Sequence, residues 1–319
     1  MAMFKIGIIG CGRMAAKMIE SIKDLKEVEV VAVASREKAR ANKFVKQNCP
    51  DAKPLGSYEQ MTRQKDIDLV YIATPNTFHY ENAVMCVKNH MNVLVEKPFV
   101  MSREEADSIF TEAKNRGVFV CEAMWTSFMP LHKKMMSWIK DGKIGAVRYV
   151  QSNLGYNIEN VQRITDPTLG GGAHLDIGVY PTNLAVSILG ENLEPVSVFA
   201  HKYSTGVEKD VSCVLEVPHD GALAVSFVTV ASLTDRDGSV IGENGYIKIF
   251  NINDYEKIEL YNTKGELIES AERSGINSYA VEILACVDAI NKGLIQCPEM
   301  PWHKTACIAS LNDKIRKMI

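Results

Sequence analysis

The sequence predicts an α/β protein with an N-terminal doubly wound parallel sheet and a C-terminal α/β domain that carries a large, mainly antiparallel open sheet. Two patterns along the 319 residues support this fold class. Short Val- and Ile-rich runs alternate with amphipathic segments over the first ~120 residues, as in repeated strand–helix–strand units. Beyond Pro130 the apolar runs become longer, and several are joined by turns that favour antiparallel hairpins.

Strands of the parallel sheet are expected where brief apolar runs can be buried on both faces. Helical spacing lies between these runs. Ser102, followed by Glu104 and Glu105, marks one helix start, and Gly117 lies close to the end of that helix. The alternation predicts a doubly wound sheet within residues 1–124. We assign strands to residues 4–9, 28–34, 69–73, 93–95 and 118–121, and helices to residues 13–23, 37–47, 78–88 and 103–115.

Residues 125–319 are expected to form the second domain, which binds substrate and oligomerises. An open sheet of this kind often pairs with a second copy across its free face, so we expect a homo-oligomer formed through it. Hairpin turns are predicted at Asp220-Gly221, Asn244-Gly245 and Lys264-Gly265. We assign strands to residues 147–154, 196–201, 211–217, 222–230, 246–250 and 257–261, and helices to residues 131–141, 278–292 and 302–318.

Composition and charge exclude several classes of protein. Hydrophobic residues make up 46% of the chain and charged ones 24%, which is typical of a globular protein. The formal net charge of -3 argues against nucleic acid or an anionic membrane as a partner. No apolar run reaches the ~18 residues that a membrane-spanning helix needs.

The eight cysteines are scattered, with no CxxC pair and no close Cys/His cluster. In a chain of this length such scatter predicts reduced thiols in a reducing compartment, and it argues against a zinc site. We therefore expect a cytoplasmic protein without a bound metal.

A glycine-rich turn follows the first expected strand directly. Gly10 permits the tight turn, Gly12 lets a pyrophosphate approach the backbone, and Ala15 allows close packing of helix and strand. Backbone N–H groups at the helix start, where the helix dipole is positive, would hold the phosphates. The turn predicts a Rossmann dinucleotide site, although a similar turn can occur without a ligand. The run is Gly10-Cys11-Gly12-Arg13-Met14-Ala15, a G-x-G-x-x-A pattern.

The end of the second strand bears on which dinucleotide binds. NAD-preferring sites usually have an Asp or Glu here, which accepts a hydrogen bond from the ribose 2′-hydroxyl. This chain has Ala34-Ser35-Arg36 instead, with Lys38 and Arg40 following. Arg36 offers a guanidinium fork and a flat face for adenine, while Ser35 can donate to a 2′-phosphate. We predict a preference for NADP without excluding NAD. The alternative is that Arg36 is only an exposed residue at a helix start.

Several motifs, spread over residues 4–181, together resemble the Gfo/Idh/MocA oxidoreductases, and the domain order matches over the whole chain. Residues 122–126 ahead of Pro130, and Asp-x-x-x-Tyr at 176–180, are most similar to the branch of dimeric dihydrodiol dehydrogenase and glucose–fructose oxidoreductase. The inositol dehydrogenase branch commonly has His in place of Tyr180. The motifs are the glycine turn of residues 10–15, Thr74-Pro75-Asn76 with His79, Glu96-Lys97-Pro98, and the glycine run of residues 170–172 with Asp176 and Tyr180.

The resemblance implies a Rossmann domain, an open-sheet domain and a nicotinamide cofactor. It also implies that the substrate is a sugar, a polyol or a vicinal diol such as a trans-dihydrodiol, and that the chain forms a homo-dimer or homo-tetramer. The residues that it places along the cofactor are Thr74, Pro75, Asn76, His79, Glu96 and Lys97.

Hydride transfer between nicotinamide and a carbinol carbon requires a proton partner for the oxygen. A cation at Lys97 would stabilise alkoxide charge and favour the phenolate of a neighbouring tyrosine. Asp176 and Tyr180 are four residues apart, so one helical turn would place them on the same face, unless Pro181 starts a new segment. We expect Tyr180 to be the acid/base and Lys97 to tune it. Asp176 would orient Lys97 or bind a substrate hydroxyl.

Trp125 and Tyr156 are candidate substrate contacts, because aromatic rings stack on the apolar face of a sugar or diol. Trp125 is equally compatible with an ordinary core position.

The function favoured by these residues is that of an NADP-preferring dehydrogenase or reductase acting on a CH–OH group. The alternative is a regulator that binds dinucleotide and sugar without chemistry, since the same fold also serves in transcriptional control. Lys97, Asp176 and Tyr180 together favour the enzyme.

Overall fold

The computed structural model describes residues 3–275 and 277–319, and these form two compact units. The first unit comprises the chain up to Trp125 together with the segment that ends at Thr305. The second comprises Thr126–Gly275 and Ala306–Ile319. This division differs from the two contiguous segments expected from the sequence, because a C-terminal segment returns to the first unit.

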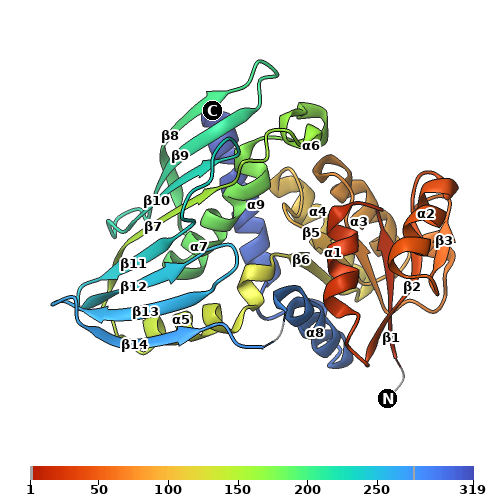
Figure 1. The fold of residues 1–319 in the computed structure, drawn as a ribbon, viewed down its shortest axis with the longest axis horizontal. Helices are drawn as coiled ribbons and strands as arrows, with labels where there is room; N and C mark the ends of the chain where they lie inside the picture. Colours follow the sequence, from red (N-terminus) through yellow and green to blue (C-terminus); the bar gives the residue numbers. More distant parts are fainter. Residues whose placement is uncertain (1–2, 276) are drawn as a thin grey trace. The chain divides into compact units, whose positions relative to one another are not determined.

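The first unit contains a six-stranded parallel sheet in the order β3-β2-β1-β4-β5-β6, which confirms the predicted doubly wound topology (Figure 1). The strand order reverses beside β1, and in such sheets ligands bind at the carboxyl ends of the strands at this point. Every residue of β4, β5 and β6 is buried, as expected for strands covered on both faces. Strand β3 was not predicted, because three residues are too few to show a pattern. The strands are β1 (Phe4–Ile9), β2 (Val28–Ala34), β3 (Lys53–Leu55), β4 (Leu69–Ile72), β5 (Val93–Glu96) and β6 (Val120–Ala123).

Aromatic contacts explain why the C-terminal segment belongs to this unit. Tyr279 stacks on Trp125 with ring centroids 4.2 Å apart, and Trp302 stacks on Phe110 at 5.1 Å. Trp302 Nε1 also donates to the backbone oxygen of Val120, at 2.8 Å. No local pattern in the sequence indicates such long-range pairs. The helices of this unit are α1 (Arg13–Ile22), α2 (Lys38–Asn48), α3 (His79–Lys88), α4 (Arg103–Arg116) and α8 (Ser278–Asn291).

The second unit contains an eight-stranded sheet in the order β14-β13-β12-β11-β7-β10-β9-β8 (Figure 1). All neighbours are antiparallel except β7 and β10, which confirms the mainly antiparallel sheet predicted. Strands β11 and β14 were not predicted, because glycines bound the first and polar residues interrupt the second. The strands are β7 (Val147–Gly155), β8 (Glu194–Lys202), β9 (Glu208–Glu216), β10 (Leu223–Thr229), β11 (Gly238–Gly242), β12 (Gly245–Phe250), β13 (Lys257–Asn262) and β14 (Leu267–Glu272).

Helices pack against one face of this second sheet. Helix α5 (Pro130–Lys140) contacts β13, and α7 (Val179–Leu189) contacts β7. The chain also forms the short α6 (Gln162–Thr165) and the C-terminal α9 (Trp302–Met318). Large apolar side chains remain exposed on the strands, among them Phe199 of β8 and Phe227 of β10. Within the described residues, none of the helices combines the length and the apolar character needed to cross a bilayer.

Candidate active site

The turn after β1 has the geometry that its glycines predicted. Gly10 has φ +111°, and a Cβ there would collide with the backbone oxygen of Ala73, so only glycine fits. Beside Gly12 the space is open, because a Cβ would meet only the Ala73 oxygen, at 3.9 Å. The backbone at Gly12 therefore lies accessible beside the start of α1.

The start of α1 suits an anion. Gly12 is the N-cap, and no side chain in the described part of the chain caps the helix. The first turn contains no acidic residue, and its first residue, Arg13, is exposed. Cys11 and Met14 are half-buried. Backbone N–H groups at a helix start favour phosphate, so these residues fit the pyrophosphate of a dinucleotide.

Basic residues follow β2 where the adenosine end of a dinucleotide would lie. The Arg36 side chain is exposed, and its guanidinium carbon lies 5.5 Å from the ring centroid of Phe78. Ser35 is buried, and its hydroxyl accepts from the backbone N–H of Glu37 at 3.5 Å. Lys38 instead donates to the backbone oxygen of Pro54.

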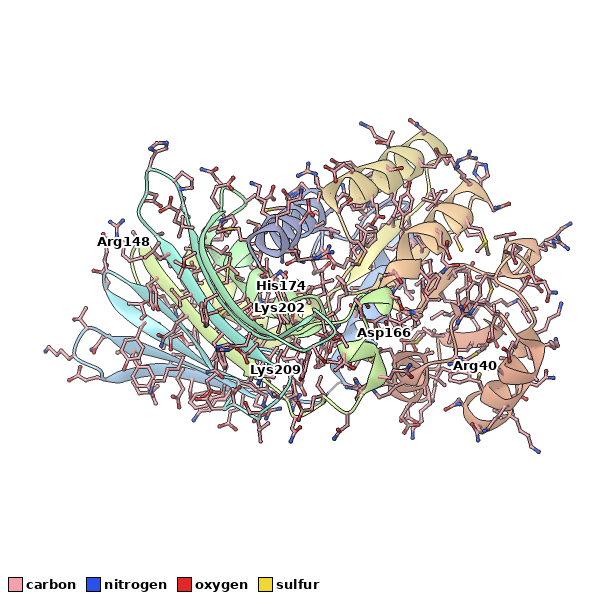
Figure 2. The ribbon with its side chains drawn as sticks, turned by 90° about the horizontal axis from the view of Figure 1, so that it is seen from above. Arg40, Arg148, Asp166, His174, Lys202 and Lys209 are labelled. Atoms are coloured by element: carbon pink, nitrogen blue, oxygen red, sulfur yellow. The ribbon has the colours of Figure 1, made fainter. Side chains whose placement is uncertain are left out.

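Arg40 is a candidate that the sequence reasoning left out of the site. Figure 2 shows it on α2. Its charge acts on Cys11, where burial raises the pKa of the thiol and the Arg40 guanidinium opposes the increase. Arg40 therefore adds positive charge near the glycine turn. Its place in the basic run that follows β2 was the signal that could have indicated it.

The segment that carries Lys97 follows β5 and is held at three successive residues. Glu96 Oε2 accepts from the Lys97 N–H at 3.2 Å. His79 Nδ1 lies 2.8 Å from the Pro98 oxygen. Glu122 Oε1 accepts from the Phe99 N–H at 3.1 Å. These contacts fix the backbone on both sides of Lys97, whose own side chain is half-buried.

His79, which was predicted to lie along the cofactor, contacts two backbone carbonyls in the structure. The ring is fully buried, and its Nε2 lies 2.9 Å from the backbone oxygen of Thr74. Burial lowers the pKa of His79, although both carbonyl contacts favour the protonated ring. His79 thus joins the loop after β4 to the loop after β5. Pro75 and Asn76, in the first of these loops, remain partly exposed.

Three glutamates lie buried beneath the Lys97 segment, and each is at most 5% exposed: Glu96, Glu122 and Glu282. The Tyr71 hydroxyl donates to Glu96 Oε1. Burial raises the pKa of Glu122 to about 7, although hydrogen bonds from Thr305 and the Phe99 N–H oppose the increase. Burial and the neighbouring Glu96 raise the pKa of Glu282 well above its ordinary range. Protons are therefore retained in this cluster near neutral pH.

The second unit holds the segment with Asp176 and Tyr180. Gly172 has φ +111°, and a Cβ there would collide with the carboxylate of Glu208. That carboxylate, on β9, accepts from the N–H of His174 at 2.9 Å, at the start of the segment. Gly172, in the glycine run of residues 170–172, thus leaves room for a buried glutamate.

Asp176 and Tyr180 do not share one regular helical turn. Asp176 lies in a π-helix, η5 (His174–Gly178), and Tyr180 lies in α7, which continues through Pro181. The wider turn of a π-helix removes the simple alignment of residues four apart. Asp176 pairs with Arg163 of α6, a residue that no sequence signal indicated. Both Asp176 and Tyr180 are less than 10% exposed.

The two aromatic candidates already have partners in the structure. Trp125 is 5% exposed and stacks on Tyr279, so one of its faces is covered. Tyr156 follows β7, and its hydroxyl accepts from Asn253 Nδ2 at 2.9 Å. The guanidinium carbon of Arg236 lies 5.6 Å from its ring centroid.

Comparison with known proteins identifies the class of this fold and site. Residues 4–124 match the oxidoreductase family with an NAD-binding Rossmann fold, and residues 132–248 match the GFO/IDH/MocA C-terminal domain. The chain belongs to the Gfo/Idh/MocA family and is an NAD(P)-binding oxidoreductase.

Two relatives and one solved structure illustrate the similarity. Trans-1,2-dihydrobenzene-1,2-diol dehydrogenase of Homo sapiens is 29% identical over 330 residues, covering 98% of this chain and 96% of that protein. D-xylose 1-dehydrogenase (NADP(+)) of Hypocrea jecorina is 28% identical over 316 residues, covering 88% and 81%. KijD10, a 3-ketoreductase from Actinomadura kijaniata solved with TDP-benzene and NADP in an open conformation, has a TM-score of 0.86 and 25% identity, covering 98% and 97%.

The buried carboxyl of Glu122 predicts a pH-dependent stability. Because its pKa is near 7 in the folded protein and near 4.5 when exposed, the folded state binds the extra proton between these values. The stability present below pH 4.5 is lost as the pH rises through 7, by about 3 kcal/mol. Glu122→Gln removes this pH-dependent contribution to stability. The Tm of the variant should therefore rise relative to the Tm of wild type as the pH increases from 5 to 8. Glu27→Gln, at an exposed position, is the control. A difference in Tm between Glu122→Gln and wild type that does not change with pH would contradict the assignment.

Proposed function

We propose that the chain is an NADP-preferring dehydrogenase or reductase that acts on a CH–OH group of a sugar, polyol or trans-dihydrodiol. The observation that carries this proposal is the Lys97 segment, fixed at three successive residues beyond the carboxyl end of β5. A lysine held in this way can present its ammonium group to a substrate oxygen. The names of the diol dehydrogenase and xylose dehydrogenase relatives support this substrate class.

The preference for NADP rests on the residues that follow β2. Arg36 and Arg40 supply positive charge, and no carboxylate stands where NAD-preferring sites have one. A 2′-phosphate gains from a guanidinium fork more than a 2′-hydroxyl does. The NADP(+) in the name of the xylose dehydrogenase and the NADP in the ketoreductase structure support the same preference.

The catalytic roles follow from the chemistry of the side chains. A bound nicotinamide supplies or accepts the hydride. Lys97 stabilises negative charge on the substrate oxygen, and the Tyr180 phenol gives or takes the proton at that oxygen. Asp176, paired with Arg163, keeps the start of the Tyr180 helix in place and offers an acceptor for a substrate hydroxyl.

A homo-dimer or homo-tetramer formed through the second sheet belongs to the same proposal. Phe199 on β8 is 63% exposed, and Ile268 on β14 is 59% exposed, which leaves apolar surface for a second copy to cover. We also propose a cytoplasmic location, in line with eight cysteines that are all free thiols.

Replacing Arg36 tests the cofactor preference. Arg36→Ala should lower kcat/KM with NADPH by about 10-fold to 100-fold and leave the value with NADH nearly unchanged, because only the 2′-phosphate loses its partner. Lys38→Ala is the matched control, since its ammonium group donates to Pro54. Equal use of the two cofactors by wild type would refute the preference.

Replacing Lys97 and Tyr180 tests the chemistry. NADPH absorbance is followed with a panel of aldoses, polyols and dihydrodiols. Lys97→Met and Tyr180→Phe should each reduce kcat by about 100-fold or more while NADPH still binds, because each removes a group that acts at the reacting oxygen. Lys53→Met and Tyr203→Phe serve as controls. Turnover that survives both substitutions would rule out these roles, and cofactor binding without turnover by wild type would favour a sensor.

A further inference from the structure

One edge of the second sheet gathers several chain segments. Strands β7 and β10 are parallel, so their carboxyl ends meet at this edge, where β9 and β11 begin. The N–H of Tyr156, just beyond β7, donates to the Thr229 oxygen at the end of β10. The Asp176 segment starts at the same edge, because His174 is bonded to Glu208 at the start of β9 (Figure 2).

Arg236 lies at this edge in a strained backbone conformation. Its φ is +64°, a value that is uncommon for a residue with a side chain. Two hydrogen bonds stabilise this conformation: the Arg236 N–H donates to Asn153 Oδ1 and to Thr234 Oγ1, both at 3.2 Å. Such outliers persist only where the surroundings fix them, and they gather at functional sites. The conformation directs the guanidinium over the ring of Tyr156.

The guanidinium of Arg236 has donors that the protein leaves unused. Its Nε is buried with no hydrogen-bond partner, and neither Nη bonds to an acceptor among the described residues. Close by, Asn253 donates to the Tyr156 hydroxyl, and its own Oδ1 is a buried acceptor without a partner. Unpaired donors and an unpaired acceptor together match a hydroxyl group, which needs both.

The charges around Arg236 argue against an acidic ligand. Asp235 and Asp237 flank it in sequence, and the Arg236 charge acts on Asp237, whose pKa burial raises. Glu256 adds a further negative charge at Asp237. The Arg236 charge is thus opposed by neighbouring carboxyls, so a carboxylate or phosphate would meet repulsion.

We propose that Arg236, held on the ring of Tyr156, is a specificity-determining residue that binds the hydroxyl groups of a neutral sugar or polyol. The inference rests on the proposed function and names the substrate class of that site. Tyr156, predicted as a direct substrate contact, then acts by positioning Arg236. Neutral polyhydroxylated compounds are preferred over sugar acids and sugar phosphates.

The test measures ligand binding and turnover with NADP-loaded protein. Thermal-shift titrations and steady-state kinetics use D-xylose, D-glucose and D-glucuronate. Arg236→Met should raise Kd and KM for the neutral sugars about 10-fold with little change in kcat, since it removes uniform binding. Arg236→Lys should recover part of the loss. Arg148→Met, at the opposite end of β7, is the matched control (Figure 2).

The outcomes separate this inference from the proposed function. Unchanged Kd and KM in Arg236→Met, with a wild type that turns over neutral sugars, would overturn the inference alone. Tighter binding of D-glucuronate than of D-glucose would overturn the substrate class. A wild type that neither binds nor turns over any of the three sugars would refute the inference, and failure with dihydrodiols as well would refute the proposed function. If Arg236→Met raises Kd for the neutral sugars and the wild type shows no turnover, the inference is supported for a protein that senses the sugar without converting it.

Discussion

The backbone of residues 97–99 is fixed by buried side chains, and the proposed chemistry depends on that constraint. A lysine on a flexible loop would lose entropy each time it met the substrate, whereas a fixed backbone removes part of that cost before binding. Glu96 and Glu122 hold two N–H groups, and His79 contacts the carbonyl between them. Burying two carboxyls for this purpose is unfavourable unless protons or donors compensate them. That cost explains why burial raises the pKa of Glu122 to about 7.

In the second unit, too, a buried glutamate fixes the backbone of a segment that carries candidate catalytic residues. Glu208, on β9, accepts from the N–H at the start of the segment that carries Asp176 and Tyr180. Burial raises the pKa of Glu208, as it does for Glu122, while the His174 N–H opposes the increase. In both units a buried glutamate fixes the backbone beside a candidate catalytic residue. Hydrogen bonds of this kind specify one backbone conformation where apolar packing alone allows several.

Much of the fold could be predicted from the sequence, because its strongest signals are local. The Val- and Ile-rich runs predicted β1 and β2 at their observed bounds, and Gly10 and Gly12 predicted the tight turn between β1 and α1. The hairpins at Asp220-Gly221, Asn244-Gly245 and Lys264-Gly265 lie where their turn residues predict. The return of α8 to the first unit was missed, since it depends on Tyr279 and Trp302 meeting rings more than a hundred residues away. The π-helix at Asp176 was also missed, because no residue pattern distinguishes it from an α-helix.

The site residues also fall into two groups, those whose position a local pattern predicts and those whose contacts it does not. Thr74, Asn76 and Lys97 stand at strand ends, a position that the order of strands and helices predicts. The ion pair of Arg163 with Asp176, the contact of Arg236 with Tyr156 and the bond from Phe99 to Glu122 join segments distant in sequence. Such contacts follow from tertiary packing, which a single sequence does not encode as a pattern.

Uptake of the dinucleotide at the glycine turn is the claim on which the others rest, and isothermal titration calorimetry tests it most directly. Wild-type protein should bind NADPH at one site per chain. Gly12→Val should abolish uptake with little change in Tm, because the space beside Gly12 is free of protein atoms closer than the Ala73 oxygen at 3.9 Å. A wild type that takes up neither NADPH nor NADH, or a Gly12→Val variant that binds as tightly as wild type, would contradict the account.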